Sequence, residues 1–233
     1  MPNTPTEVVE GAVWLGPAPV SQSGKAFDES DNSHVAVLRA ARITHVVNCT
    51  PGCPFISAAQ LGLAAGVPVG EHRVAVSDED HAWDHAAGAL DGCLDAATAF
   101  IEGAVAAGGR VYVHCETGKS RSATVVIAYR VRCCGESLRA AYNGTKAKRD
   151  YIQPKPAFFN KLVAREPVWA RAAAAAVPSF PAEEYGLVYL LDHFAPYMWV
   201  DGVSEESIRA AIAEAGGDSS RAHAKLAEIV QRS

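Results

Sequence analysis

A nucleophile and a fixed cation lie close together in the segment 114–122, which reads HCETGKSRS. Cys115 is the nucleophile, and Arg121, six residues further on, is the cation. The guanidinium of arginine has a planar fork that matches two phosphate oxygens and stays charged at any pH that a protein survives. These residue types at this spacing predict a site where a cysteine faces a bound phosphate group.

The elements on either side of this segment explain how it can bind an anion. A short buried strand is expected at 111–113 and a helix at about 122–134, so the segment joins a strand to a helix N-terminus. Such a loop points successive backbone N–H groups inward, and the helix adds a positive partial charge. The same field favours the thiolate of Cys115 over the thiol. The substrate-binding residues predicted here are Glu116, Thr117, Gly118, Lys119, Ser120 and Arg121.

Two neighbours of the cysteine have predicted supporting roles. Ser122 can donate a hydrogen bond to the leaving sulfur, and His114 can hydrogen-bond around Cys115 to fix its position. A cysteine after a strand is more often a buried core residue than a nucleophile. Here the glycine, the arginine and the serine all fall at the offsets that the chemistry requires, which favours the functional interpretation.

Strands and helices alternate along most of the chain. Strands are expected at 13–15, 43–48, 72–77 and 111–113, and helices at 34–41, 58–65, 84–107, 122–134, 137–146 and 156–165. This alternation predicts an α/β fold in which helices flank a central, mainly parallel sheet.

The motif His-Cys-x5-Arg-Ser, continued by ATVVIAY at 123–129, resembles the dual-specificity branch of the protein tyrosine phosphatases. The resemblance covers about residues 8–165 and includes VWLG at 13–16 and ITHVVN at 43–48. It implies the cysteine-phosphatase fold and hydrolysis of phosphotyrosine, phosphoserine and phosphothreonine in protein substrates. It also implies that Cys115 attacks phosphorus, that a phosphocysteine forms, and that water releases phosphate without a metal or other cofactor.

The resemblance further implies a general acid, an aspartate on the loop before the long helix, which protonates the leaving group. Three candidates are present, Asp78, Asp80 and Asp84. Asp84 lies 31 residues before Cys115, close to the usual separation, but it would also serve as an N-cap of the long helix. Asp78 follows an alternating strand pattern in Val74-x-Val76-x-Asp78. The two counts disagree; Asp84 is preferred narrowly, then Asp78, then Asp80.

Composition limits the classes of partner and location. The chain of 233 residues has 49% hydrophobic residues and a net charge of −5, which is typical of a soluble globular protein and gives no reason to expect nucleic-acid binding. No stretch reaches the roughly eighteen apolar residues of a membrane span. Residues 1–10 lack the features of a signal peptide. The six cysteines are therefore expected to be reduced. The expected location of the protein is the cytoplasm, with the nucleus as an alternative. No set of histidines and cysteines in the sequence indicates a metal site.

The C-terminal part of the chain differs from the rest. Residues 166–181 read as a linker, with five alanines at 172–176 followed by VPSFP. Residues 182–233 contain three helical patterns, at 183–194, 205–215 and 219–230, which predict a small all-α module. The last two patterns, joined by Gly-Gly-Asp, resemble the last two helices of ubiquitin-associated (UBA) or CUE domains. This second resemblance implies ubiquitin as a partner.

Two other functions compete with a protein phosphatase. A phosphatase for phosphoinositides, glucans or RNA ends would suit the basic Lys119, but Glu116 would repel a polyanionic head group, so protein substrates are preferred. An adaptor that binds phosphate or ubiquitin without catalysis is a hypothesis of another class. The intact set of Cys115, Arg121 and Ser122 argues against it.

Overall fold

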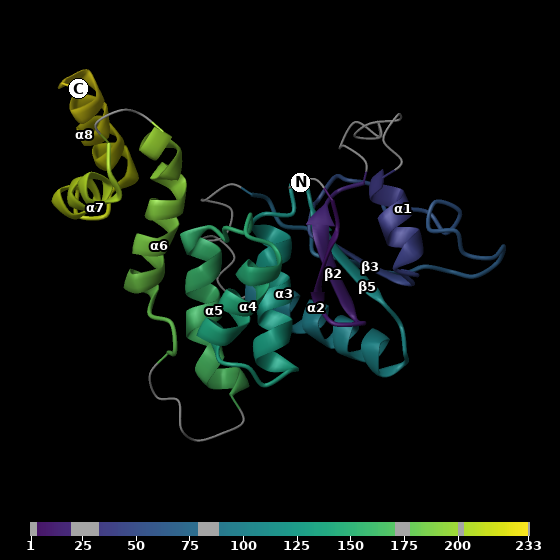
Figure 1. The fold of residues 1–233 in the computed structure, drawn as a ribbon. Helices are drawn as coiled ribbons and strands as arrows, with labels where there is room; N and C mark the ends of the chain where they lie inside the picture. The colour runs from purple at the N-terminus through teal and green to yellow at the C-terminus, as the bar shows by residue number, and fades with distance from the viewer. Residues whose placement is uncertain (1–3, 20–32, 79–88, 171–177, 200–202, 233) are drawn as a thin grey trace. The chain divides into compact units, whose positions relative to one another are not determined.

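The computed structural model describes residues 4–19, 33–78, 89–170, 178–199 and 203–232, and the chain divides into two compact units (Figure 1). The first unit is Met1–Ser179 and the second is Phe180–Ser233. The boundary falls within the predicted linker. The first unit contains all five described strands and the 114–122 segment.

A five-stranded sheet forms the centre of the first unit. Its strands are β1 (Thr6–Val9), β2 (Val13–Pro17), β3 (His45–Asn48), β4 (Gly70–Arg73) and β5 (Val111–Cys115). The strands lie side by side in the order β1-β2-β5-β3-β4, and every neighbouring pair is parallel except β1 with β2. The sheet confirms the predicted mainly parallel arrangement, although β1 was not expected. All five residues of the central strand β5 are buried, as in parallel sheets covered on both faces.

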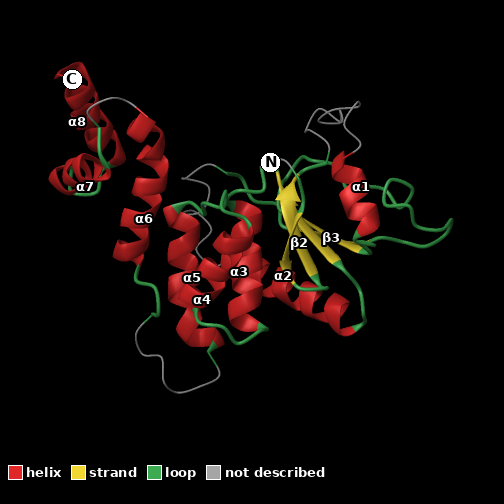
Figure 2. Cartoon of the chain, in the orientation of Figure 1, coloured by secondary structure: helices red, strands yellow, loops and turns green. Residues whose placement is uncertain are grey.

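Among the described residues, five helices accompany this sheet; helices are drawn in red in Figure 2. They are α1 (Ser33–Ala40), α2 (Ala89–Ala106), α3 (Arg121–Arg132), α4 (Leu138–Lys148) and α5 (Pro156–Trp169). Trp14, Val46 and Tyr112 pack with Leu38 of α1 in one hydrophobic cluster. Helix α3 lies against β5 and β2 and is surrounded by α2, α4 and α5. Because α3 is enclosed in this way, nearly all of its residues are buried, and its N-terminus is fixed relative to β5.

Two sequence predictions are wrong in this unit. The helix expected at 58–65 is a series of turns, because Gly62 adopts a left-handed φ angle of 72° that a helix interior does not accommodate. The strand expected at 72–77 is displaced, since β4 ends at Arg73. Beyond it the Val76 N–H donates to the Val74 carbonyl at 2.8 Å, a tight turn that takes the chain out of the sheet.

Other predicted helices agree with the structure where it describes them. The long helix is present as α2 from Ala89, while residues 84–88 of the prediction lie outside the described residues, as does the alanine run at 172–176. Helix α5 continues beyond the predicted end at Arg165 to Trp169. The Ser179 N–H and hydroxyl both donate to the carboxylate of Glu166, at 2.8 and 2.6 Å, which attaches the end of the predicted linker to α5.

The second unit is a bundle of short helices, as predicted. It contains α6 (Ala182–Phe194), the 3₁₀ helix η1 (Ala195–Trp199), α7 (Glu205–Glu214) and α8 (Ser219–Arg232). A capping box between Ser204 and Ser207 begins α7. The unit has its own core, which includes Phe194, Ile208 and Leu226. Among the helices that the structure describes, in either unit, none combines the length and the apolar composition needed to span a bilayer.

Candidate active site

The segment between β5 and α3 is a tight loop, residues 115–121, which we call the cysteine loop. Cys115 is the last residue of β5 and Arg121 the first of α3, so both ends of the loop are fixed by regular structure. Gly118 has a φ angle of 68°, and a Cβ added there would lie 2.3 Å from the Gly16 carbonyl carbon. The loop therefore passes so close to β2 that only glycine fits at this position.

The carbonyl groups of the cysteine loop are bound from outside. The Glu116 carbonyl accepts from the Ala18 N–H at 3.1 Å, the Gly118 carbonyl from Arg149 Nε at 3.1 Å, and the Lys119 carbonyl from the Gln153 N–H at 2.9 Å. In a trans peptide the C=O and the following N–H point in opposite directions. The N–H groups that follow these carbonyls consequently turn toward the inside of the loop. Inward-turned N–H groups are the donors that the predicted anion-binding cradle requires.

Cys115 is buried at the mouth of this cradle. The Ser122 hydroxyl donates a hydrogen bond to its Sγ at 3.1 Å. Ser122 itself is fully buried in the first turn of α3, so its hydroxyl is held in place. The predicted contact between Ser122 and the sulfur is present.

His114 lies beside the cysteine but contacts its backbone. Nδ1 is 3.4 Å from the Cys115 carbonyl oxygen, and the ring stacks on Tyr112 with centroids 5.5 Å apart. Complete burial lowers the pKa of His114 from 6.5 to about 3, although the contact with the Cys115 backbone acts in the opposite direction. The imidazole is therefore neutral near pH 7 and acts as a packing group for the start of the loop.

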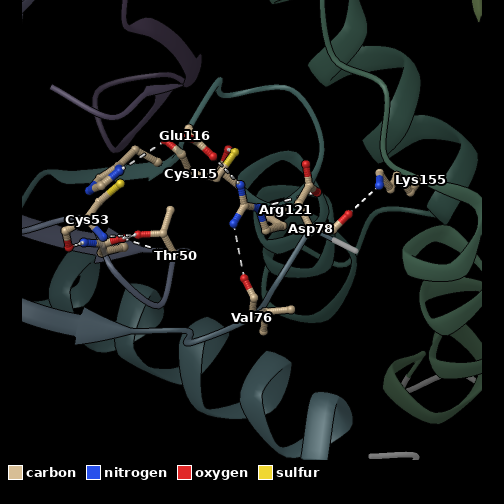
Figure 3. Close-up of polar contacts among 11 residues, drawn as sticks. Thr50, Cys53, Val76, Asp78, Cys115, Glu116, Arg121 and Lys155 are labelled. Carbon is tan, nitrogen blue, oxygen red and sulfur yellow. Dashed lines mark hydrogen bonds and ion pairs between the residues drawn. The ribbon is translucent and has the colours of Figure 1, made fainter. Parts of the chain in front are cut away.

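Arg121 reaches across the site with only 5% of its side chain exposed. Its Nη1 donates to the Val76 carbonyl at 3.2 Å (Figure 3). Its Nη2 lies 3.5 Å from Glu116 Oε2, and its Nε lies 3.5 Å from Asp78 Oδ1. Both ion-pair distances exceed the 2.7–3.2 Å typical of N–H···O hydrogen bonds, so these are loose contacts. A phosphate dianion at hydrogen-bonding distance can compete with them for the guanidinium.

Of the three candidate acids, the structure describes only Asp78. Its carboxylate faces Arg121, and Lys155 Nζ donates to its backbone carbonyl (Figure 3). Asp80 and Asp84 lie outside the described residues. Asp78 therefore lies at the site, and the preference for Asp84 remains a prediction from the sequence.

Two basic residues near the loop have contacts that the sequence did not indicate. Arg149 is buried, and besides the Gly118 carbonyl it binds the Thr4 carbonyl at 2.9 Å and Thr6 Oγ1 at 3.1 Å. The Lys155 N–H donates to Ser120 Oγ at 3.0 Å. The signal in the sequence was that both residues lie within residues 8–165, the span of the resemblance.

The remaining loop side chains point to the rim. Thr117 is exposed at the tip of the loop. The Lys119 ammonium lies 5.5 Å from the ring centroid of Tyr151, a half-exposed aromatic beside the loop.

A family model described as "Dual specificity phosphatase, catalytic domain" matches residues 27–167. The chain is 32% identical over 131 residues to dual specificity protein phosphatase MPK-4 of Drosophila melanogaster, which covers 56% of this chain and 31% of that protein. It is 42% identical over 69 residues to human dual specificity phosphatase 28, covering 30% of this chain and 39% of that protein. The chain thus spans less than half the length of these curated relatives.

Solved structures are similar over the same part of the chain. The crystal structure of human DUSP28 superposes with a TM-score of 0.56 at 29% identity and covers 72% of this chain and 96% of that chain. The crystal structure of a mouse dual specificity phosphatase complexed with zinc tungstate gives a TM-score of 0.53 at 27% identity, covering 72% and 89%.

Proposed function

Because this chain belongs to the family of dual specificity phosphatase catalytic domains, we propose that it hydrolyses phosphotyrosine and phosphoserine or phosphothreonine in protein substrates. The catalytic domain is proposed to be residues 8–165. The observation that carries the proposal is the meeting of Cys115 and Arg121 at one anion cradle, with the Ser122 hydroxyl 3.1 Å from the sulfur.

In the first proposed step the Cys115 thiolate attacks phosphorus. A sulfur–phosphorus bond forms while the bond to the leaving oxygen breaks, and that oxygen takes a proton from the general acid. Asp78 is the candidate that lies beside Arg121, and Asp84 and Asp80 are its alternatives. The inward N–H groups and the guanidinium bind the phosphoryl oxygens, where charge concentrates in the transition state.

In the second step water attacks the phosphocysteine. The sulfur–phosphorus bond breaks, and inorganic phosphate and the thiolate are formed. The same carboxylate that gave its proton can accept one from the water. Ser122 supports this step, because its hydroxyl is already directed at the sulfur on which negative charge returns. No metal is needed in either step.

Charge at the rim supports protein substrates over polyanions. Glu116 places a carboxylate within 3.5 Å of Arg121, at the entrance that a substrate must pass. A single phosphate dianion can displace this contact, whereas a head group with several phosphates meets additional repulsion. The proposed cytoplasmic location fits the six free thiols, since the nucleophile acts only when reduced.

The test is hydrolysis of an aryl phosphate in the presence of EDTA. We expect turnover by the wild type that persists with the chelator and is lost in Cys115→Ser. Cys134→Ser, which alters an exposed cysteine, is the matched control and should retain full activity. Hydrolysis of phosphotyrosine and phosphothreonine peptides should then exceed that of phosphoinositide vesicles. No turnover by folded wild type between pH 5 and 7.5, or full activity of Cys115→Ser, contradicts the proposal.

For the second unit, the resemblance of α7 and α8 to UBA or CUE helices supports ubiquitin as a proposed partner. The favouring observation is a pair of apolar side chains on η1, Met198 and Trp199, which are 48% and 91% exposed. Titration of the full chain with ubiquitin, followed by isothermal titration calorimetry, should show saturable binding that Trp199→Ala weakens. The absence of saturation at millimolar ubiquitin would exclude this partner.

A further inference from the structure

The turn before α5 lies directly against the cysteine loop. Gln153 and Lys155 both donate their backbone N–H groups to it, to the Lys119 carbonyl at 2.9 Å and to Ser120 Oγ at 3.0 Å. From this fixed position the Lys155 side chain extends to the Asp78 backbone carbonyl and donates from Nζ (Figure 3). One residue therefore contacts both the anion cradle and the stretch that carries a candidate acid.

The backbone of Lys155 is unusually well defined by its neighbours in the sequence. It lies between Pro154 and Pro156, and a residue that precedes proline is restricted to extended conformations. Lys155 has φ −61° and ψ 148°, within that range, and Pro156 begins α5 at its first turn. The backbone of Lys155 is thus held in one conformation. Its side chain therefore reaches Asp78 from a position that is fixed relative to the cysteine loop.

Asp78 needs support that does not depend on Arg121. After the turn at Val74–Val76 its stretch no longer belongs to the sheet, and Arg121 binds it through the Val76 carbonyl and the Asp78 carboxylate. A bound phosphate accepts hydrogen bonds from the guanidinium of Arg121. The contacts of Arg121 with Val76 and Asp78 are then weakened during the step in which the general acid must donate its proton. The bond from Lys155 goes to a backbone carbonyl and does not compete with phosphate.

We propose that Lys155 is a positioning residue that holds Asp78 over the cysteine loop as the proton donor to the leaving group. This proposal rests on the proposed phosphatase function and sharpens its least defined part, the choice of acid. Lys155 does not touch the reacting atoms in this account, and it acts through the Asp78 backbone.

Dependence on the leaving group is the property that separates positioning from a general structural role. A general acid contributes about 10²–10⁴-fold when the leaving oxygen needs a proton and little when the leaving group is a stable anion. Lys155→Met keeps most of the side-chain stem but removes the donor. We expect kcat/KM for phenyl phosphate, which reports the first step, to fall by roughly 10–100-fold, a part of that contribution, while kcat/KM for a fluorinated umbelliferyl phosphate changes by less than about 3-fold.

Three further single variants and one double variant complete the test. Lys155→Arg keeps a donor and should restore most of the phenyl phosphate activity, and Lys148→Met, an exposed lysine on α4, should leave both substrates unaffected. Asp78→Asn should reproduce the leaving-group dependence. Adding Lys155→Met to Asp78→Asn should then cost little more, because both changes disable the same proton transfer.

The outcomes distinguish this inference from the proposed function. Equal losses of kcat/KM on both substrates, an additive double variant, or an Asp78→Asn enzyme without leaving-group dependence would overturn the role of Lys155 while the wild type remains a phosphatase. A wild type that hydrolyses neither substrate would overturn both proposals together.

Discussion

The cysteine loop and the stretch from Val74 to Asp78 form two sides of the candidate site, but they are held by different means. The cysteine loop continues directly from a central strand into an enclosed helix, and three of its carbonyls are bound by neighbouring segments. The second stretch leaves the sheet after Val74, whose N–H still donates to the Asn48 carbonyl at 2.9 Å, and beyond it Val76 and Asp78 are bound by side chains of Arg121 and Lys155.

This difference corresponds to two requirements of the proposed chemistry. The site for phosphate charge benefits from donors that are already in place, because reorganisation during the reaction would raise the barrier. The acid has to meet leaving groups of different shape, and side-chain contacts permit adjustment that a strand does not. The comparison predicts that changes in the cysteine loop impair every substrate, whereas changes in the second stretch depend on the leaving group.

The largest effect on activity is expected from Arg121→Lys. Lysine keeps the charge but loses the planar fork that binds two oxygens, and removal of one such preorganised contact typically costs about 10²–10³-fold in rate. Because Arg121 serves the phosphate itself, the loss of kcat/KM should be similar for activated and poor leaving groups. Arg42→Lys, on the exposed surface, is the control and should be silent. A loss confined to poor leaving groups would place Arg121 with the acid instead.

The next prediction concerns the backbone of the loop. Gly118→Ala combines a left-handed φ with a collision against the Gly16 backbone, and we expect it to lower the free energy of unfolding by about 2–5 kcal/mol. Gly108→Ala is a matched control, with φ 77° but open space around the new methyl group, and should cost about 1–2 kcal/mol without loss of kcat. Urea unfolding measures both; equal costs would show that the close approach to β2 is unimportant.

A smaller effect is expected from Ser122→Ala. A hydrogen bond to a charged group contributes about 1.5–3 kcal/mol, which corresponds to a loss of roughly 10–100-fold. The loss should affect release of phosphate from sulfur more than its transfer to sulfur, so a rapid burst of the phenol product should precede slow turnover. A slow first step without a burst would assign the hydroxyl a different role.

The last prediction concerns stability at low pH. Burial holds the pKa of His114 at about 3 in the folded chain against 6.5 in the unfolded chain, so below pH 6.5 the unfolded state binds a proton that the folded state does not. The free energy of unfolding should therefore be highest above pH 6.5 and fall by up to about 1.4 kcal/mol per pH unit toward pH 3. His114→Gln should remove this part of the slope. An unchanged slope in the variant would show that other groups determine it.

The same comparison explains what the sequence could and could not predict. Cys115, Gly118 and Arg121 follow one another within a single strand-to-helix connection, so local spacing and backbone chemistry suffice to predict the cradle. The sheet and most helices were likewise predictable from alternating patterns. After Val74 the chain leaves the sheet through a turn that joins Val74 and Val76. Valine has a high strand propensity, so the alternating pattern wrongly predicted that the strand continues to residue 77.

The sequence also did not predict the contacts between distant segments. Arg149 donates a hydrogen bond to the Gly118 carbonyl, 31 residues away in the sequence, and Lys155 donates one to the Asp78 carbonyl, 77 residues away. In the sequence both are simply basic residues, and only the folded chain shows that Arg149 is buried and that Lys155 contacts both the cysteine loop and Asp78. Such roles depend on where backbone carbonyls point, which no side-chain pattern encodes.

The most direct test of the central claim is to trap the bond between Cys115 and phosphorus. Wild-type protein is mixed with an aryl phosphate, quenched in acid within milliseconds and digested for mass spectrometry. We predict that the peptide carrying Cys115 gains the mass of one phosphoryl group, in an amount that rises with the burst of phenol, and that Cys134 does not. Turnover with an unmodified Cys115 peptide throughout the burst would contradict a covalent mechanism on this sulfur.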